Sequence, residues 1–107
     1  DDQVQEILAS LITTTKINDS SRLAGTVQEN LIKSTRKKFR ELKNLGVKEG
    51  PFYVLHGADM PSILVEVGFL TNQKESQMLS KPDYLYRLAS SIAEGIYKYL
   101  QDKDPSI

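Results

Sequence analysis

The chain has 107 residues, enough for one small domain with a modest core. It contains no cysteine, which excludes disulfide bonds and thiolate metal sites. Fourteen basic residues balance fourteen acidic ones, so the net charge gives no reason to expect nucleic acid or an anionic membrane as a partner. No apolar run approaches the ~18 residues of a membrane span.

Two helices are expected in the first third of the chain. The first spans about residues 3–13, and the Thr13–Thr15 run then weakens it, because β-branched side chains lose rotamer freedom in a helix. The Asn18–Ser21 residues are all favourable N-caps and predict a second helix over about 20–37. The apolar stripe of the first helix has helical spacing and consists of Val4, Ile7, Leu8, Leu11 and Ile12.

Seven basic residues lie between Lys33 and Lys48. They fit a solvated helix end followed by a loop, since cations are favourable near a helix C-terminus. A patch for nucleic acid or another anionic polymer is the alternative, which the balanced net charge and the lack of interleaved aromatic residues disfavour.

Two short apolar runs predict strands over about 52–56 and 62–67. The loop between them is too short for the crossover that joins parallel neighbours, so the strands are either antiparallel neighbours or not adjacent. Two strands do not form a stable sheet alone. Either the helices cover the pair, or further strands come from a longer polypeptide.

Glu66 lies inside the apolar run Ile63–Val67. A carboxylate is rarely buried without a partner, because its desolvation is costly. If the strand is central, Glu66 lies at its carboxyl end, where α/β proteins place their chemistry, and burial would strengthen it as a general base. The alternative is an edge strand on which Glu66 alternates outward into water.

Two helices are expected in the last third. Asn72–Glu75 forms a capping-box pattern that predicts a helix over about 73–79, and Pro82 suits the first turn of a helix over about 82–100. The tyrosines of the last helix fall on more than one face, which indicates half-buried positions and not a sugar-stacking platform; they are Tyr84, Tyr86, Tyr97 and Tyr99.

The segment PFYVLHGADMPSILVEVGFLTNQKE, residues 51–75, resembles the carboxyl-terminal signature of zinc-dependent N-acetylmuramoyl-L-alanine amidases. These bacterial enzymes cut the bond between N-acetylmuramic acid and the first L-alanine of the peptidoglycan stem. The family pattern is Val-Leu with Arg or Lys, a small-residue turn, Met/Ile-Pro, a strand ending in Glu, then Gly-Phe and Ser/Thr-Asn. The stretches SSRLAGTVQENL and AEGIYKYL also resemble family helices.

The resemblance implies an α/β fold, a partial three-layer amidase domain with two short strands and about four helices. Residues 1–107 would form one domain, the carboxyl-terminal half of the catalytic domain. Residues 1–17 resemble the end of the regulatory helical insert of cell-division members. The abrupt start at Asp1, without methionine, agrees with a processed or excised piece of a longer protein.

By resemblance, Glu66 matches the family glutamate that acts as general base on a zinc-bound water. The family's zinc ligands, two histidines and a glutamate, come from earlier motifs that do not occur here. We therefore expect no metal or cofactor site in this chain alone, and no isolated activity. His56 stands where the family usually carries Arg or Lys, so we expect an exposed or hydrogen-bonded turn histidine instead of a ligand.

The expected function is therefore that of a peptidoglycan hydrolase, located in the periplasm or the extracellular cell wall. The partners implied are peptidoglycan and an activator protein, with neither nucleic acid nor a membrane span. The alternative is a non-catalytic association module derived from such a domain, whose exposed sheet edges would seek partners.

Overall fold

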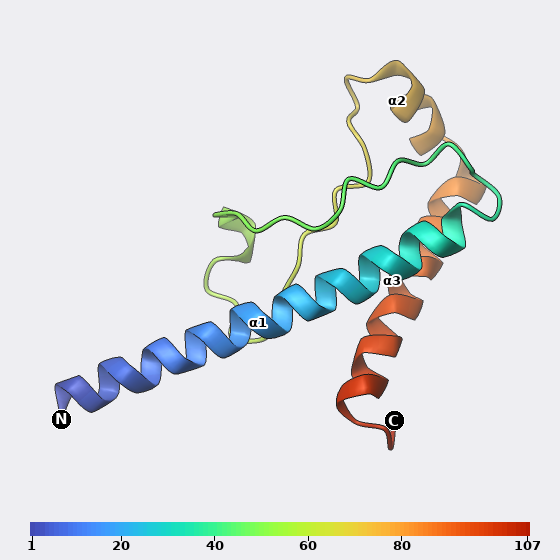
Figure 1. Ribbon diagram of the computed structural model, residues 1–107. Coiled ribbons are helices and arrows are strands. Elements are labelled where there is room, and N and C mark those ends of the chain that lie inside the picture. Colours follow the sequence, from blue (N-terminus) through green and yellow to red (C-terminus); the bar gives the residue numbers. More distant parts are fainter.

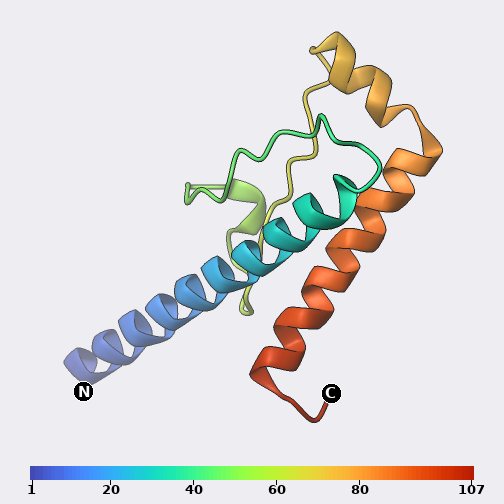
Figure 2. The same ribbon diagram turned by 45° about the vertical axis from the view of Figure 1, so that its right-hand side comes forward.

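The computed structural model describes all residues 1–107 and consists of three α-helices and one short 3₁₀ turn (Figure 1). In chain order these are α1 (Asp2–Thr35), the 3₁₀ turn η1 (Tyr53–Leu55), α2 (Gln73–Leu79) and α3 (Pro82–Lys103). Helices α1 and α3 pack across each other. The connecting chain runs back along α1 to η1 and then returns to α2 (Figure 2).

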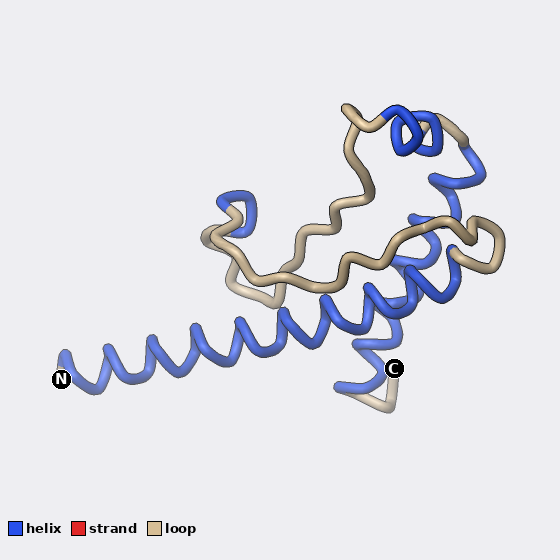
Figure 3. Tube along the Cα trace, turned by 45° about the horizontal axis from the view of Figure 1, so that its top comes forward, coloured by secondary structure: helices blue, strands red, loops and turns tan.

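The expected α/β fold, with strands over 52–56 and 62–67 in a partial three-layer domain, is wrong, because the chain forms no strand (Figure 3). The first segment curls into η1, where the amide of His56 donates to the carbonyl of Tyr53 at 2.9 Å. This local turn uses a donor that a sheet ladder would need.

The second expected strand, 62–67, is an extended stretch without a neighbouring strand. The amide of Ser62 donates to the hydroxyl of Ser20 on α1, with an N to O distance of 3.0 Å. An isolated pair of strands is marginal in water, so the apolar side chains of this stretch gain more by packing on the helices. Val65 makes this contact with the core.

One continuous helix, α1, replaces the two helices expected over 3–13 and 20–37. The threonine run costs at most roughly 0.7 kcal/mol per residue in helix propensity, and neither glycine nor proline occurs between residues 13 and 20, where the two expected helices would separate. Three of the four side chains expected to cap a second helix make other contacts. Asp19, for example, accepts a hydrogen bond from Lys103 of α3 at 3.1 Å, and this bond lowers the pKa of the Asp19 carboxyl.

Helices α2 and α3 confirm the elements expected over 73–79 and 82–100, although α3 continues to Lys103. The Asn72 side chain caps α2 by accepting from the amide of Glu75 at 3.0 Å. Pro82 lies in the first turn of α3. Backbone amides in this turn have no acceptor within the helix, so the lack of an N–H in proline costs no hydrogen bond.

The core lies where α1 crosses α3. Only ten of the 107 residues are buried, and the central cluster is Leu31, Ile32, Tyr84 and Leu88. Phe39 meets Tyr84 edge to face, with ring centroids 4.9 Å apart. Helix α2 and the extended chain add partly buried side chains to this cluster, among them Val65, Met78 and Leu79.

Gly95 marks the closest approach of the two helices. A Cβ placed on it would lie 2.8 Å from the Cα of Val27, which is too close for any real contact. Beside this point the buried Asn30 amide donates to the carbonyl of Ser91 at 2.7 Å, and Lys98 donates to the Asn30 side-chain oxygen at 2.7 Å. At the crossing, therefore, a glycine allows the two backbones to approach, and the buried side chain of Asn30 beside it has hydrogen-bond partners.

The molecule is more extended than a compact domain of its length. Its radius of gyration is 16.7 Å, against roughly 13 Å expected from chain length. The amino-terminal half of α1 projects from the body (Figure 1), and its whole apolar stripe is exposed. The small core at the helix crossing thus leaves many apolar side chains in water.

Gly95→Ala should lower the free energy of unfolding by roughly 1–3 kcal/mol, because the added methyl group must separate α1 from α3. Urea unfolding followed by circular dichroism measures this. Gly25→Ala is the matched control, since Gly25 is exposed in α1 with nothing within 4 Å, and it should stabilise by about 0.5–1 kcal/mol. Equal effects of the two changes would refute the close approach.

Candidate functional site

Glu66 lies on the extended stretch between η1 and α2, on the side that faces away from the helices. Side chains alternate along extended backbone. Ile63 and Val65 are half-buried, whereas Leu64 and Glu66 are exposed. The burial expected for a central strand is therefore absent, and Glu66 has the outward orientation of the alternative interpretation.

Two side chains of α1, one helical turn apart, hold the chain that leads to Glu66. The ammonium group of Lys16 donates to the carbonyl of Ala58, and the hydroxyl of Ser20 accepts from the amide of Ser62. After Glu66, Gly68 adopts φ +155°, and a Cβ placed on it would lie 3.3 Å from a side-chain carbon of Leu79 in α2. Hydrogen bonds thus hold the chain to α1 before Glu66, and the chain passes close to α2 after it.

The single histidine is exposed, as expected. Its ring stacks on Tyr53, with centroids 6.1 Å apart and planes 6° from parallel, in the turn after η1. No three His, Cys, Asp or Glu side chains lie close enough together to hold a metal ion. The residues of this chain therefore do not fit the three-ligand zinc site that the family resemblance implies.

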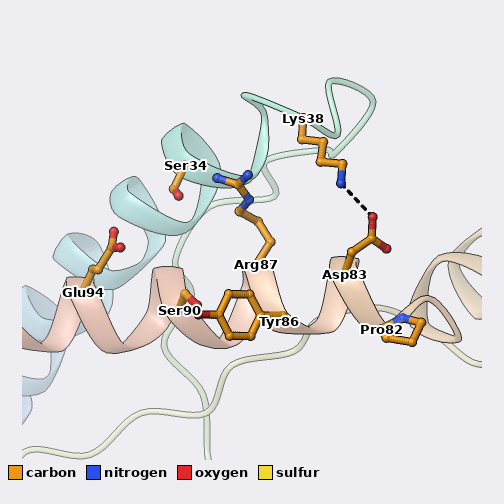
Figure 4. Close-up of a pocket in the computed structure, with 8 residues that line it drawn as sticks. All are labelled: Ser34, Lys38, Pro82, Asp83, Tyr86, Arg87, Ser90 and Glu94. Atoms are coloured by element: carbon orange, nitrogen blue, oxygen red, sulfur yellow. Dashed lines mark hydrogen bonds and ion pairs between the residues drawn. The ribbon is translucent and has the colours of Figure 1, made fainter.

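A groove lies elsewhere, between the C-terminal end of α1 and the first half of α3 (Figure 4). It has a volume of about 670 Å³, and neither Glu66 nor its neighbours in the sequence line it. Most of its lining residues have polar or charged side chains; the lining consists of Ser34, Lys38, Pro82, Asp83, Tyr86, Arg87, Ser90 and Glu94.

One ion pair closes the end of this groove. Lys38 donates to Asp83 at 2.9 Å, and this hydrogen bond lowers the pKa of the Asp83 carboxyl. The guanidinium of Arg87 points toward Ser34 and the last turn of α1 (Figure 4), and no carboxylate lies within salt-bridge distance of it. Arg87 thus presents unused hydrogen-bond donors to the groove.

The expectation of half-buried tyrosines on the last helix is wrong. Tyr84 and Tyr99 are buried, whereas Tyr86 and Tyr97 are 76% and 50% exposed.

The groove was not predicted from the sequence. The signal that could have found it is the polar face of α3, on which residues 83, 87, 90 and 94 recur at helical spacing beside the tyrosine at 86. None of the helices is both long and apolar enough to cross a bilayer.

Comparison with known proteins agrees with the resemblance of the signature. Residues 8–98, which include Glu66, match the family of N-acetylmuramoyl-L-alanine amidases. The chain is 34% identical to the germination-specific N-acetylmuramoyl-L-alanine amidase of Bacillus subtilis over 92 residues, 84% of this chain and 37% of the relative. It is 35% identical to the N-acetylmuramoyl-L-alanine amidase AmiC of Neisseria meningitidis over 97 residues, 91% of this chain and 22% of the relative.

A third relative, the N-acetylmuramoyl-L-alanine amidase AmiA of Escherichia coli, is 29% identical over 99 residues, 92% of this chain and 32% of the relative. The chain thus spans little more than a third of these relatives at most. No solved structure matches the chain closely enough for a comparison of folds. Because the family match covers most of its length, the chain belongs to the N-acetylmuramoyl-L-alanine amidase family.

Proposed function

We propose that residues 1–107 act as the carboxyl-terminal part of a peptidoglycan amidase, which hydrolyses the amide between N-acetylmuramic acid and L-alanine. The observation that supports this most is the family match, which runs through the segment bearing Glu66. Because the chain spans a limited part of its relatives, the complete reaction requires polypeptide beyond these residues.

Glu66 is the residue of this chain to which we assign the chemistry. A carboxylate can accept the proton of the attacking water and pass it to the leaving amine, which contributes about 10²–10⁴-fold to a rate. We assign this role to Glu66 because it matches the family glutamate by resemblance, and no hydrogen bond or ion pair within the chain occupies its carboxylate. A substrate bound on the outer side of the extended stretch would meet it directly.

Zinc would, when bound, polarise the amide and activate the water. Since residues 1–107 do not fit a zinc site, we assign it no step here, and its ligands would have to come from other polypeptide. We place the activity outside the cytoplasm, at the cell wall, in the periplasm or beyond it. The resemblance of residues 1–17 to the insert of cell-division members supports control by an activator protein.

Glu66→Gln, in a longer amidase that includes residues 1–107, should lower the release of stem peptide from purified sacculi by about 10²–10⁴-fold. Glutamine fills the same space but cannot accept the proton of the water. Glu41→Gln, at an exposed loop residue, is the control and should leave the rate unchanged. Residues 1–107 alone should release no peptide. Near-normal hydrolysis by the Glu66 variant would overturn the assigned role.

A second candidate function, association without catalysis, is favoured by the exposed apolar side chains. The stripe of α1 and the stretch around Glu66 both present such side chains to water, for example Leu11, Ile12, Met60 and Phe69. Contiguous exposed apolar surface commonly marks an interface.

Size-exclusion chromatography with light scattering separates the two candidate functions. A monomer with one cooperative unfolding transition is expected for an autonomous association module, because such a module must stay folded with its binding surface exposed to water before the partner binds. Concentration-dependent oligomers are expected for the incomplete part of a larger domain, because its apolar side chains then cover one another. A stable monomer up to about millimolar concentration would contradict the incomplete-domain interpretation.

A further inference from the structure

We propose that the groove between α1 and α3 binds a saccharide of peptidoglycan that carries a carboxylate, with Tyr86 as the stacking surface and Arg87 as the carboxylate ligand. This inference rests on the proposed function, since it names a second contact with the same polymer, separate from Glu66. The groove is lined by none of the residues around Glu66, so the two contacts can be tested independently.

Tyr86 gives the groove an aromatic wall. Its ring is 76% exposed and lies beside Ser90 on α3 (Figure 4). A pyranose ring has an apolar C–H face and a polar rim of hydroxyl groups, so an aromatic side chain with a polar tip complements it. The hydroxyls of Ser34 and Ser90 and the carboxylate of Glu94 can meet that rim.

Arg87 gives the groove a site for an oxyanion. Its planar guanidinium offers five donors that match the two oxygens of a carboxylate, and no side chain of this protein pairs with it. The nearby end of α1 is also favourable for a cation, which explains why an arginine is tolerated there without a carboxylate. The stem peptides of peptidoglycan supply carboxylates, and the lactyl group of muramic acid supplies one once its amide to L-alanine has been cut.

The volume and charge of the groove fit this ligand better than a polyanion. About 670 Å³ lies within the range of roughly 300–1,000 Å³ that small-molecule sites occupy. Although basic residues gather at this end of α1, Asp83 and Glu94 balance the two cations that line the groove, Lys38 and Arg87, so the groove lacks the net positive charge that a chain of phosphates requires. A mixed polar lining with one ring favours a carbohydrate.

The test is isothermal titration of residues 1–107 with three probes: a disaccharide–peptide fragment of peptidoglycan, glycan strands freed of peptide, and the free stem peptide. The disaccharide–peptide should bind, and Tyr86→Ala and Arg87→Gln should each raise its Kd by about tenfold. Tyr97→Ala is the matched control, because Tyr97 is an exposed tyrosine of α3 that does not line the groove. It should change the Kd less than twofold.

The other probes identify the carboxylate. Binding of peptide-free glycan, sensitive to Arg87→Gln, would support the lactyl group as the ligand of Arg87; binding of the disaccharide–peptide alone would support the peptide. Equal binding of the free stem peptide would overturn the proposal, because that probe has no pyranose ring. Tighter binding of inorganic polyphosphate, with a steep salt dependence, would overturn it in favour of a polyanion site.

A last variant separates this inference from the proposed function. Glu66→Gln should leave the Kd of the disaccharide–peptide unchanged, since Glu66 does not line the groove. A loss of binding in Glu66→Gln but not in Tyr86→Ala would overturn the groove site and still support a substrate at Glu66. Equal affinities of the Tyr86→Ala and Tyr97→Ala variants, or no binding of any probe, would overturn the groove site outright.

Discussion

The close contact of α1 with α3 at Gly95 is the constraint on which the rest of the structure depends. Because residue 95 has no side chain, Val27 can approach the backbone of α3, and the buried side chains on either side of this point interlock. The side-chain amide of Asn30 donates to the carbonyl of Ser91 at the same crossing. Helix α2 and the extended chain have little core of their own and are attached to this pair.

This arrangement displays Glu66 without enclosing it. Lys16 and Ser20 of α1 hold the chain before the residue, and the chain passes close to α2 at Gly68 after it, yet the helices cover only one side of the stretch. A general base needs a substrate and an attacking water held beside it in a site that excludes bulk solvent. The chain therefore contributes a positioned carboxylate, while the enclosure of that carboxylate would have to come from other polypeptide or from the substrate.

Local signals predicted the elements that local interactions stabilise. The cap at Asn72 and the proline at residue 82 mark the starts of α2 and α3, and the signature that contains Glu66 was sufficient to identify the family. The strands could not be predicted correctly from apolar runs, because a strand requires a partner and the pattern of one segment does not show whether a partner exists.

Two further predictions from the sequence were wrong because they depend on tertiary contacts. The polar residues expected to cap a second helix are used to bind distant groups, as Ser20 does with Ser62, so α1 continues through them. The exposure of Tyr86 depends on where α1 crosses α3, which the sequence of α3 alone does not determine. Helix ends and stripes are local properties, whereas crossings, grooves and strand pairing are not.

Amide hydrogen exchange, followed by NMR on residues 1–107, tests most directly whether Glu66 sits on an unpaired stretch held by a helix pair. Amides of α1 and α3 near the crossing, such as those of Leu31 and Leu88, should exchange slowly, because their opening requires the core to separate. Amides of residues 63–67 should exchange rapidly, with protection confined to Ser62. Slow exchange at alternate residues through 63–67, the pattern of a paired strand, would contradict this structure.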